Sequence, residues 1–130
     1  MPVEHDIEVL GEFQRPYVYQ VPRTFYEEAH AKIRELEEKG VMEKGKSNFV
    51  SPLVCARKKD GRLRLCGDFR ALNKITVPDL YPLPRIDVIK QSVRGYLFST
   101  IDLKEGFYQV PIAAKDKHKT AMVTPWGLYV

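Results

Sequence analysis

Asp102 is the residue of this sequence whose surroundings most favour chemistry. It follows the apolar or small residues of FSTI and precedes Gly106 and two aromatic residues in FSTIDLKEGFYQVPI. A buried carboxylate is costly unless it is paired or binds a cation. Three interpretations follow. Asp102 caps the next turn, forms an ion pair with Lys104 or another base, or ligates magnesium, which takes carboxylate oxygens together with substrate phosphates.

Basic residues gather in one part of the chain. Between Lys44 and Arg64 there are seven Lys or Arg and a single acid, Asp60, whereas acids dominate from Glu27 to Glu43. A local basic block suits a polyanion, such as a nucleic acid or a nucleoside triphosphate. The alternative is a solvated basic surface without a partner, which composition alone favours.

The basic block contains a predicted β-hairpin over residues 49–70. Two β-rich runs flank an Asp-Gly pair, and a two-residue turn there would place Lys59 opposite Arg62. One face then carries leucines and the other is basic, as alternation along the strands requires. The predicted basic face holds Cys55, Arg57, Lys59, Arg62, Arg64, Cys66, Asp68 and Arg70. Such a face would bind phosphate, with Arg64 as a fork and Lys59 as a point charge.

The cysteines and histidines argue against other kinds of site. Cys55 and Cys66 would lie opposite each other in this register, but they are too few for a disulfide scaffold and match no zinc-binding spacing. A reduced, intracellular setting is therefore expected. The sequence has no Gly-rich phosphate loop and no Cys/His cluster, and its three histidines are scattered. These features disfavour a metal- or nucleotide-binding enzyme of another class.

The elements that would position these residues can be placed from periodicity and capping residues. A helix from Thr24 to Gly40 has apolar residues at helical spacing, a capping box formed by Thr24 and Glu27, and a C-terminal glycine. The other predicted elements are an extended lead-in over residues 1–23, an extended connection over 71–84, a short helix over 85–94, and strands over 96–103, 119–124 and 128–130. The expected buried residues of the short helix are Ile86, Ile89 and Val93.

Length and composition suit one domain or a piece of one. The chain has 130 residues, of which 44% are hydrophobic, enough for a core. The strand 96–103 is apolar enough to be buried on both faces. No stretch approaches the apolar length that spans a bilayer, and the N-terminus lacks a signal-peptide pattern. Because the chain stops within the last predicted strand, we expect it to be a piece of a longer domain.

Several separate segments resemble the reverse transcriptases of gypsy-type LTR retrotransposons and their retroviral relatives. They are ARKKDGRLRLCGDFRALNKITVPDLYPLPRID, FSTIDLKEGFYQVPI and DKHKTAMVTPWGLY, and the resemblance runs from about Arg15 to Val130. It implies an α+β fold of antiparallel strands and packing helices, belonging to a right hand of fingers, palm and thumb. It divides the chain into a lead-in (1–23), a fingers-like segment (24–95) and the start of the palm (96–130).

The resemblance also implies roles for the residues of the D-L-x-x-G-[FY]-x-Q motif. Asp102 matches the first catalytic aspartate. With the backbone carbonyl of Leu103 it would hold magnesium, or manganese in its place, against an incoming deoxynucleoside triphosphate (dNTP). Phe107 matches the bulky residue that excludes a ribose 2′-hydroxyl by a clash, and Gly106 lets the sugar approach. The motif is completed by Tyr108 and Gln109.

In the fingers, Arg64 matches the arginine that grips the triphosphate. Either Lys58 or Lys59 matches the family's lysine there, and the predicted register favours Lys59. Asp68 and Arg70 match positions that line the template strand, although an Asp-x-Arg pair on one strand face is also a common surface salt bridge.

The implied partners are dNTP, an RNA or DNA template-primer, and the remainder of a pol polyprotein with its palm, thumb and RNase H; no membrane is expected. The implied location is cytoplasmic, in a virus-like particle, with a nuclear step.

Two features depart from the family pattern. Gly67 stands where a β-branched residue is usual, which weakens the strand slightly. The chain also ends before the Y-x-D-D hairpin that brings the other two catalytic carboxylates. We therefore expect RNA-directed DNA polymerase activity, the two-metal transfer of dNTPs to a primer 3′-hydroxyl, in the longer protein and not in this chain alone. The alternative function is a degenerate or domesticated fragment that binds nucleic acid without chemistry.

Overall fold

A four-stranded β-sheet in the order β2-β1-β3-β4 carries the fold in the computed structural model, which describes residues 3–130. The strands are β1 (Ser51–Arg57), β2 (Leu63–Gly67), β3 (Met122–Thr124) and β4 (Gly127–Tyr129). The helices are α1 (Tyr26–Glu38), α2 (Arg70–Asn73) and α3 (Ile86–Ser92), with 3-10 turns η1 (Arg23–Phe25), η2 (Gly106–Gln109) and η3 (Lys117–Thr120). β1 pairs antiparallel with β2 and parallel with β3, whereas β3 and β4 are antiparallel. The predicted α+β class is confirmed. Across residues 3–130, none of the helices is both long and apolar enough to cross a membrane.

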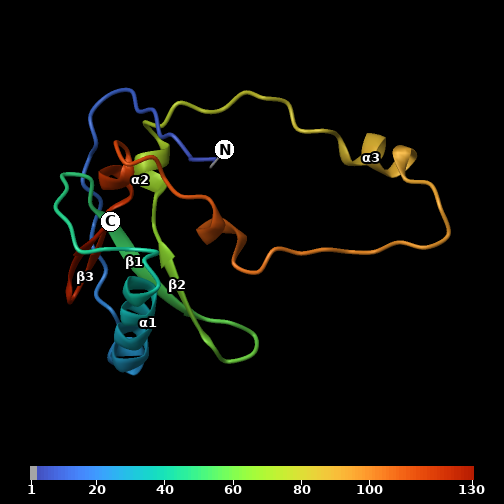
Figure 1. The fold of residues 1–130 in the computed structure, drawn as a ribbon. Coiled ribbons are helices and arrows are strands. Elements are labelled where there is room, and N and C mark those ends of the chain that lie inside the picture. The colour runs from blue at the N-terminus through green and yellow to red at the C-terminus, as the bar shows by residue number, and fades with distance from the viewer. Residues whose placement is uncertain (1–2) are drawn as a thin grey trace.

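Helix α1 packs on the sheet through the apolar side that its sequence predicts (Figure 1). Ala29, Ile33 and Leu36 are buried. Ile33 meets Leu53 of β1 and Tyr129 of β4 in the main core cluster. Because a fully buried aliphatic side chain contributes about 1.5–3 kcal/mol, these few contacts hold helix and sheet together.

The two ends of α1 were not predicted equally well. Gly40 ends the helix as predicted: its φ is +69°, and the amide of Val41 donates across it to the carbonyl of Leu36 at 2.9 Å, the long bond of a Schellman motif. The capping box predicted at Thr24 is wrong, because no side chain caps the helix. The 3-10 turn η1 supplies its first turn instead.

The β1–β2 hairpin forms where predicted, but its register differs by one residue. The amide of Lys58 donates to the carbonyl of Arg62 at 2.8 Å, which leaves a three-residue loop in which Gly61 has a φ of +81°. A residue in the left-handed region at this point is typical of three-residue hairpin loops. The predicted pairing of the two cysteines is therefore wrong, because Cys66 lies opposite Val54.

The one-residue shift rearranges both faces of the hairpin, since side chains alternate along each strand. Lys58 now shares a face with Arg64, while Lys59 lies in the loop. The register argument that favoured Lys59 over Lys58 is therefore wrong. Cys55 and Arg57 move to the other face, together with the leucines of β1 and β2.

Gly67, the departure from the family pattern, ends β2 at a crowded point. A Cβ at this position would lie 2.7 Å from ring atoms of Phe69 and 2.8 Å from the Sδ of Met122. A β-branched side chain would force both neighbours to move. A glycine lowers the strand propensity at this position, but it lets Phe69 and Met122 approach the backbone closely.

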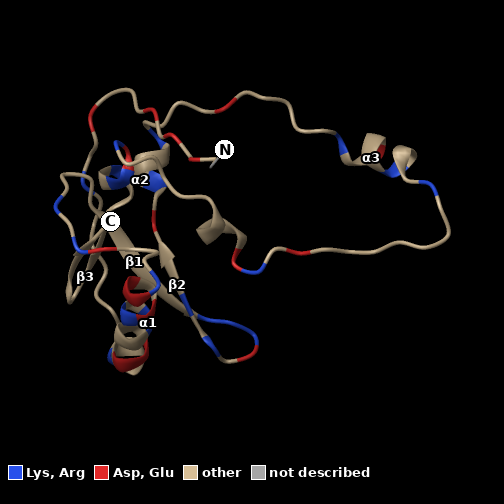
Figure 2. Ribbon diagram, in the orientation of Figure 1, with Lys and Arg blue, Asp and Glu red and all other residues tan. Residues whose placement is uncertain are grey.

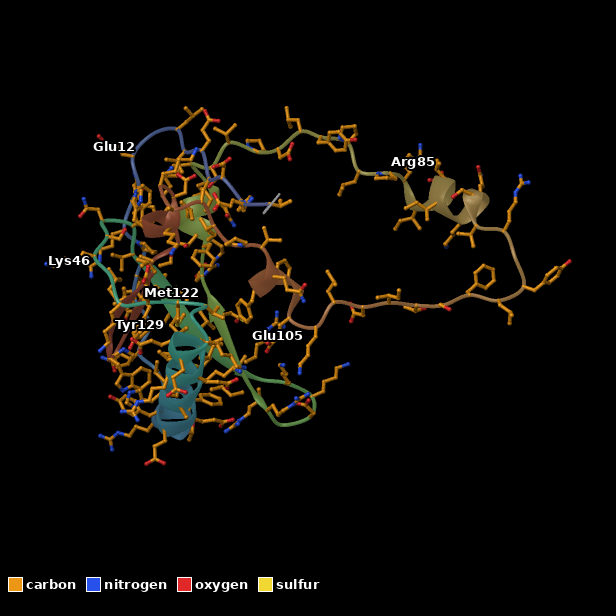
Figure 3. The ribbon with its side chains drawn as sticks, viewed as in Figure 1. Glu12, Lys46, Arg85, Glu105, Met122 and Tyr129 are labelled. Atoms are coloured by element: carbon orange, nitrogen blue, oxygen red, sulfur yellow. The ribbon has the colours of Figure 1, made fainter. Side chains whose placement is uncertain are left out.

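Residues 78–110 form an arm that leaves the sheet and returns to it (Figure 1). The arm carries α3, as predicted, but the strand predicted over residues 96–103 is absent. Its large apolar side chains are exposed, including the three expected to be buried on the short helix: Leu80, Tyr81, Leu83, Ile86, Val88, Ile89, Val93, Tyr96, Leu97, Phe98, Ile101 and Leu103. In Figure 3 the side chains of the arm project into open space. A strand needs a neighbour for its backbone groups, and no described residue provides one here.

The C-terminal strands follow the prediction in outline. The strand predicted over residues 119–124 is shorter, because η3 occupies its first part and only β3 forms. The predicted turn before β4 is present, and the hydroxyl of Thr124 donates to the carbonyl of Gly127 at 2.8 Å. Trp126 in this turn stacks on His30 of α1, with ring centroids 4.5 Å apart. His30 is thus a packing residue.

The observed register determines which cysteine pair can be oxidised. In the variant Val54→Cys, the new thiol lies opposite Cys66, and such partners have Cα atoms about 5.5 Å apart, within disulfide range. We expect this variant to form an internal disulfide under mild oxidation. In the parent chain Cys55 and Cys66 lie on opposite faces and should stay reduced. Peptide mapping without reductant checks both, and a Cys55–Cys66 crosslink in the parent would contradict the register.

Candidate functional site

A hollow of about 620 Å³ lies between α1, the edge strand β2 and the turn η2. We call it the hairpin hollow. Arg64 of β2 lines it together with Phe107 and Tyr108, which lie at the returning end of the arm. Figure 3 shows this return at Glu105, beside the hairpin. The fold thus brings the basic hairpin and the aromatic residues of the motif, which are far apart in sequence, to one place.

Lys58 and Arg64 are the basic residues of the hairpin hollow that have no acidic partner within ion-pair distance among residues 3–130. Arg62 also lines the hollow, but its guanidinium pairs with Asp60 at 2.6 Å. Figure 2 shows this concentration of basic residues at the hairpin tip. The two free cations are therefore those on the shared face, at the edge of the hollow.

Acidic residues also line the hollow: Glu28 and Glu35 of α1, which are paired with basic residues, and Glu105 of the arm. Hydrogen bonds from Lys39, and next from Lys32, lower the pKa of Glu35 to about 2, so this carboxylate stays ionised. Arg57 pairs with Glu28 at 2.6 Å and lies over the ring of Phe25. An anion entering the hollow would therefore meet Lys58 and Arg64 as its uncommitted cations.

A tight turn follows Asp102 and directs the motif towards the hollow. Glu105 has a φ of +51°, which is uncommon for a residue other than glycine. Its carbonyl accepts a hydrogen bond from the amide of Tyr108 at 2.9 Å. The side-chain amide of Gln109 donates to the carbonyl of Lys104 at 2.8 Å and closes the turn. Backbone strain of this kind is concentrated at functional sites.

Gly106 and Phe107 occupy the tip of this turn. A Cβ on Gly106 would lie 3.3 Å from the Cβ of Leu103, so the missing side chain lets the turn close on Leu103. Phe107 is 98% exposed. Its ring stands uncovered at the mouth of the hollow, available to a ligand.

Asp102 lies before the turn and does not line the hairpin hollow. Asp102 is exposed. Within residues 3–130 its carboxylate makes neither the local cap nor the ion pair with Lys104 that the sequence allowed. The structure therefore does not bring Asp102 together with Arg64. No three His, Cys, Asp or Glu side chains of the described chain are grouped as metal ligands. Asp102 alone offers one hard oxygen donor, so these residues do not complete a magnesium site by themselves.

Asp68 and Arg70 form the surface ion pair that was the alternative to a template contact. The guanidinium of Arg70 donates to both carboxylate oxygens of Asp68, at 2.8 and 2.6 Å. Arg70 lowers the pKa of Asp68 to about 2. The two residues line a second hollow, beside residues 19–22, and not the hairpin hollow.

The N-terminal segment 5–10 holds both ends of the arm. The amide of Leu10 donates to the carbonyl of Ile75, and the amide of Val77 to the carbonyl of Glu8, where the arm leaves. Where the arm returns, His5 exchanges two backbone hydrogen bonds with residues 111–113. The same short segment therefore determines where the arm starts and where it ends.

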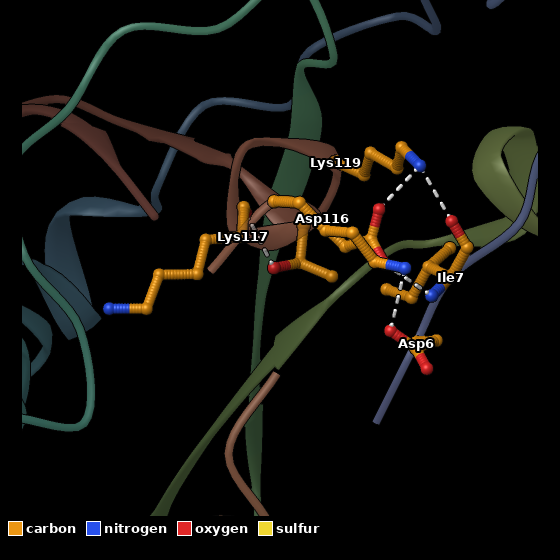
Figure 4. Close-up of polar contacts among 7 residues, drawn as sticks. Asp6, Ile7, Asp116, Lys117 and Lys119 are labelled. Atoms are coloured by element: carbon orange, nitrogen blue, oxygen red, sulfur yellow. Dashed lines mark hydrogen bonds and ion pairs between the residues drawn. The ribbon is translucent and has the colours of Figure 1, made fainter. Parts of the chain in front are cut away.

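Asp116 and Lys119 secure this segment (Figure 4). Asp116 is only 4% exposed and accepts a hydrogen bond from the amide of Ile7 at 2.9 Å. Lys119 donates to both Asp116 and the carbonyl of Ile7, each at 2.6 Å. Sequence analysis missed this pair. Its only local signal is the spacing of Asp116 and Lys119 by three residues, which does not reveal the distant partner Ile7.

Comparison with known proteins agrees with this architecture. Residues 56–129, more than half of the chain, match the family described as reverse transcriptase (RNA-dependent DNA polymerase). The chain belongs to that family, as the motif resemblance implied.

Retrotransposon polyproteins are among its curated relatives. The Transposon Tf2-3 and Tf2-4 polyproteins of Schizosaccharomyces pombe (strain 972) are each 28% identical over 130 residues, which is 98% of this chain. The chain spans about a tenth of the length of these relatives. The match therefore covers one part of these polyproteins.

Solved structures of foamy viral enzymes share the fold. The Prototype Foamy Virus protease-reverse transcriptase (a mutant) matches with a TM-score of 0.85 and 23% identity, over 97% of this chain and 17% of the other. The foamy viral protease-reverse transcriptase described in complex with double-stranded DNA matches with a TM-score of 0.77 and 26% identity, over 98% and 25%. Since nearly the whole chain is covered, the likeness includes the exposed arm.

The Asp116 cluster should control how firmly the N-terminal segment is held. We expect Asp116→Ala to accelerate amide exchange at residues 5–10, and Asp116→Asn to do so less, because the amide oxygen still accepts from Ile7. Lys119 first, and then the Ile7 amide, lower the pKa of Asp116 in the folded protein. The contribution of Asp116 is therefore complete above its unfolded pKa, about 3.9, and is lost as pH falls through the lower folded pKa.

Hydrogen exchange with mass spectrometry, corrected for intrinsic rates, measures this effect. Lys115→Met is the matched control, since it removes the exposed Lys115–Asp6 pair next to the cluster and should change protection little. Unchanged exchange at residues 5–10 in Asp116→Ala would show that the cluster does not secure the segment.

Proposed function

We propose that this chain supplies the fingers and the first catalytic motif of the RNA-directed DNA polymerase of a gypsy-type LTR retrotransposon, acting within a longer pol polyprotein. The observation that carries the proposal is the hairpin hollow, which is lined by Lys58, Arg64 and the uncovered ring of Phe107; neither cation has an acidic partner among residues 3–130. A nucleotide needs cations for its phosphates and a ring or backbone for its sugar and base. The hollow offers both.

In this proposal the hairpin binds the triphosphate of an incoming dNTP. The planar guanidinium of Arg64 forms two hydrogen bonds with phosphate oxygens, and the ammonium of Lys58 acts as a point charge. Lys58 takes the role that the predicted register gave to Lys59, because it lies on the face of Arg64. Phe107, at the tip of the turn after Asp102, would lie against the sugar, and its ring would leave no room for a ribose 2′-hydroxyl.

Magnesium, or manganese in its place, supplies charge neutralisation at the phosphates and activates the primer 3′-hydroxyl when it is bound. In this chain the carboxylate of Asp102 and the carbonyl of Leu103 would hold it. Asp102 supports this role by being exposed and uncommitted. The remaining carboxylates would come from elsewhere in the polyprotein, which agrees with the prediction that the 130-residue chain is inactive alone.

The proposed partners are an RNA or DNA template-primer and the remainder of the polyprotein. Foamy viral relatives are described in complex with double-stranded DNA and with an RNA/DNA hybrid. The exposed apolar residues of the arm suit burial against further strands of a palm. A virus-like particle in the cytoplasm remains the proposed location.

A fragment that binds nucleic acid without chemistry is the second candidate. The unpaired cations of the hairpin tip favour it, because they would bind a polyanion without any metal. It predicts nucleic-acid affinity of the chain alone that falls steeply with salt and is lost when Arg62 and Arg64 become alanine. Nucleotide incorporation by the longer protein would decide for the polymerase.

Substitutions in the hairpin should separate the two lysines. In the polymerase that contains this chain, we expect Arg64→Ala and Lys58→Ala each to raise the KM for dNTP by about 10- to 100-fold, because each removes a hydrogen bond to a charged group worth about 1.5–3 kcal/mol. Lys59→Ala is the matched control and should stay near the wild type. Steady-state primer extension measures these values. A larger effect of Lys59→Ala than of Lys58→Ala would contradict the assignment.

Phe107 should determine the choice of sugar. We expect Phe107→Ala to increase incorporation of ribonucleotides relative to deoxynucleotides by at least about tenfold, since a lost steric contact of this size changes selectivity by that order. Phe107→Tyr keeps the bulk and should keep the selectivity. Competitive single-nucleotide extension measures the ratio, and equal selectivity in the two variants would argue against the role. Asp102→Asn should abolish extension in every case.

A further inference from the structure

Glu28 of α1 holds both strands of the hairpin near its loop. One of its carboxylate oxygens accepts a hydrogen bond from the guanidinium of Arg57 on β1 at 2.6 Å. The other oxygen accepts from the backbone amide of Leu63 on β2 at 3.2 Å. Arg57 and Leu63 are directly paired between the strands. One helix residue therefore fastens both members of the strand pair that lies nearest to the loop.

Arg57 extends this connection to the loop itself. Its Nη1 also donates to the carbonyl of Gly61 at 3.1 Å, and Gly61 is the loop residue in the left-handed region. The guanidinium lies 4.9 Å from the centre of the Phe25 ring, an arrangement that attracts a cation to the ring. We call Glu28 and Arg57 the hairpin tether, because these two side chains join α1, both strands and the loop.

The residues that Glu28 holds come directly before the two uncommitted cations of the hairpin hollow. Arg57 is followed by Lys58, and Leu63 is followed by Arg64. Successive side chains of a strand point to opposite faces. Contacts made on the side of α1 therefore fix the backbone from which Lys58 and Arg64 reach the hollow on the other side.

Glu28 also lines the hairpin hollow, so its charge affects an anion that binds there. An unpaired carboxylate at this wall would repel phosphate, and the ion pair with Arg57 neutralises it. The side chains of Arg57 and Glu28 are 44% and 45% exposed, and an isolated pair at such exposure contributes little to stability. The importance of the tether therefore lies in the groups that it positions.

We propose that Glu28 is a positioning residue of the nucleotide site, which holds the hairpin on α1 so that Lys58 and Arg64 meet the triphosphate in one arrangement. The proposal rests on the proposed polymerase function and adds a residue that acts through its neighbours. Groups that are already held in place lose less freedom on binding, which raises the affinity for the ligand. Loss of the tether should therefore weaken dNTP binding and leave the chemical step largely intact.

Steady-state primer extension by the polymerase that contains this chain tests the role. We expect Glu28→Ala to raise the KM for dNTP about 3- to 10-fold, because an ion pair and a hydrogen bond to a charged acceptor are lost. The kcat should change less than about twofold. Glu28→Gln keeps an oxygen for the amide of Leu63, so its KM should rise less. The Kd for primer-template, measured without dNTP, should not change.

Glu27→Ala is the matched control variant. Glu27 carries the same charge and also lies in the first turn of α1, but it lines a separate hollow formed by residues 23–27 and not the hairpin hollow. It should leave KM and kcat as in the wild type. An equal rise of KM in Glu27→Ala and Glu28→Ala would show an effect of helix charge alone and would overturn the proposal.

The Arg64→Ala background separates positioning from a general loss of structure. Part of the effect of Glu28→Ala acts through Arg64, so the factor by which it raises KM should be smaller in this background than in the wild type. The same factor in both backgrounds would contradict the positioning role. Thermal unfolding checks each variant, and Glu28→Gln, the milder change, gives the same comparison if Glu28→Ala does not fold.

Amide exchange in the same protein tests the tether without catalysis. Glu28→Ala should accelerate exchange in the peptide that contains Leu63, and Glu27→Ala should not. Accelerated exchange together with failure of the wild type to extend a primer would contradict the polymerase function and leave the tether standing. Unchanged exchange at Leu63 in Glu28→Ala would show that the tether does not hold the hairpin.

Discussion

The hydrogen bond between Lys58 and Arg62, with Gly61 in the left-handed region between them, sets the arrangement of the hairpin. It fixes the register of β1 against β2, and because side chains alternate, it also fixes which charges share a face. Arg57 is turned towards α1, where Glu28 neutralises it. Lys58 and Arg64 are left on the other face without an acidic partner among the described residues. The three-residue loop with Gly61 thus sets the register, and the register determines which basic side chains face the hairpin hollow.

In the arm, by contrast with the hairpin, a predicted strand does not form. Its apolar residues are exposed, and the segment before Asp102 forms no strand. The two ends of the arm are nevertheless held by backbone hydrogen bonds to residues 5–10. Burying such residues would stabilise the chain, but the described residues 3–130 provide no surface that covers them. The likeness to larger foamy viral enzymes covers nearly the whole chain, the arm included.

The N-terminal lead-in positions residues at two places in the fold. Its first part fixes the base of the arm through the buried Asp116 and Lys119. Its later part places Tyr19 at the second hollow, which Arg70 also lines, and Tyr17 packs on Tyr19. Both parts form no regular strand or helix, and their hydrogen bonds and contacts are with distant residues. A segment without periodicity can thus position residues at two separate places.

The sequence by itself determined α1, the existence of the hairpin, the turn before β4, the α+β class and membership of the reverse transcriptase family. These depend on nearest neighbours in the chain: apolar spacing, glycines at turns, and motifs of fixed spacing. Tertiary structure decided the hairpin register, the placement of Lys58 on the face of Arg64, the absent strand before Asp102 and the burial of Asp116. The physical reason is that each of these depends on a partner far away in sequence, such as Ile7 for Asp116, or on a neighbouring strand that the local pattern cannot supply.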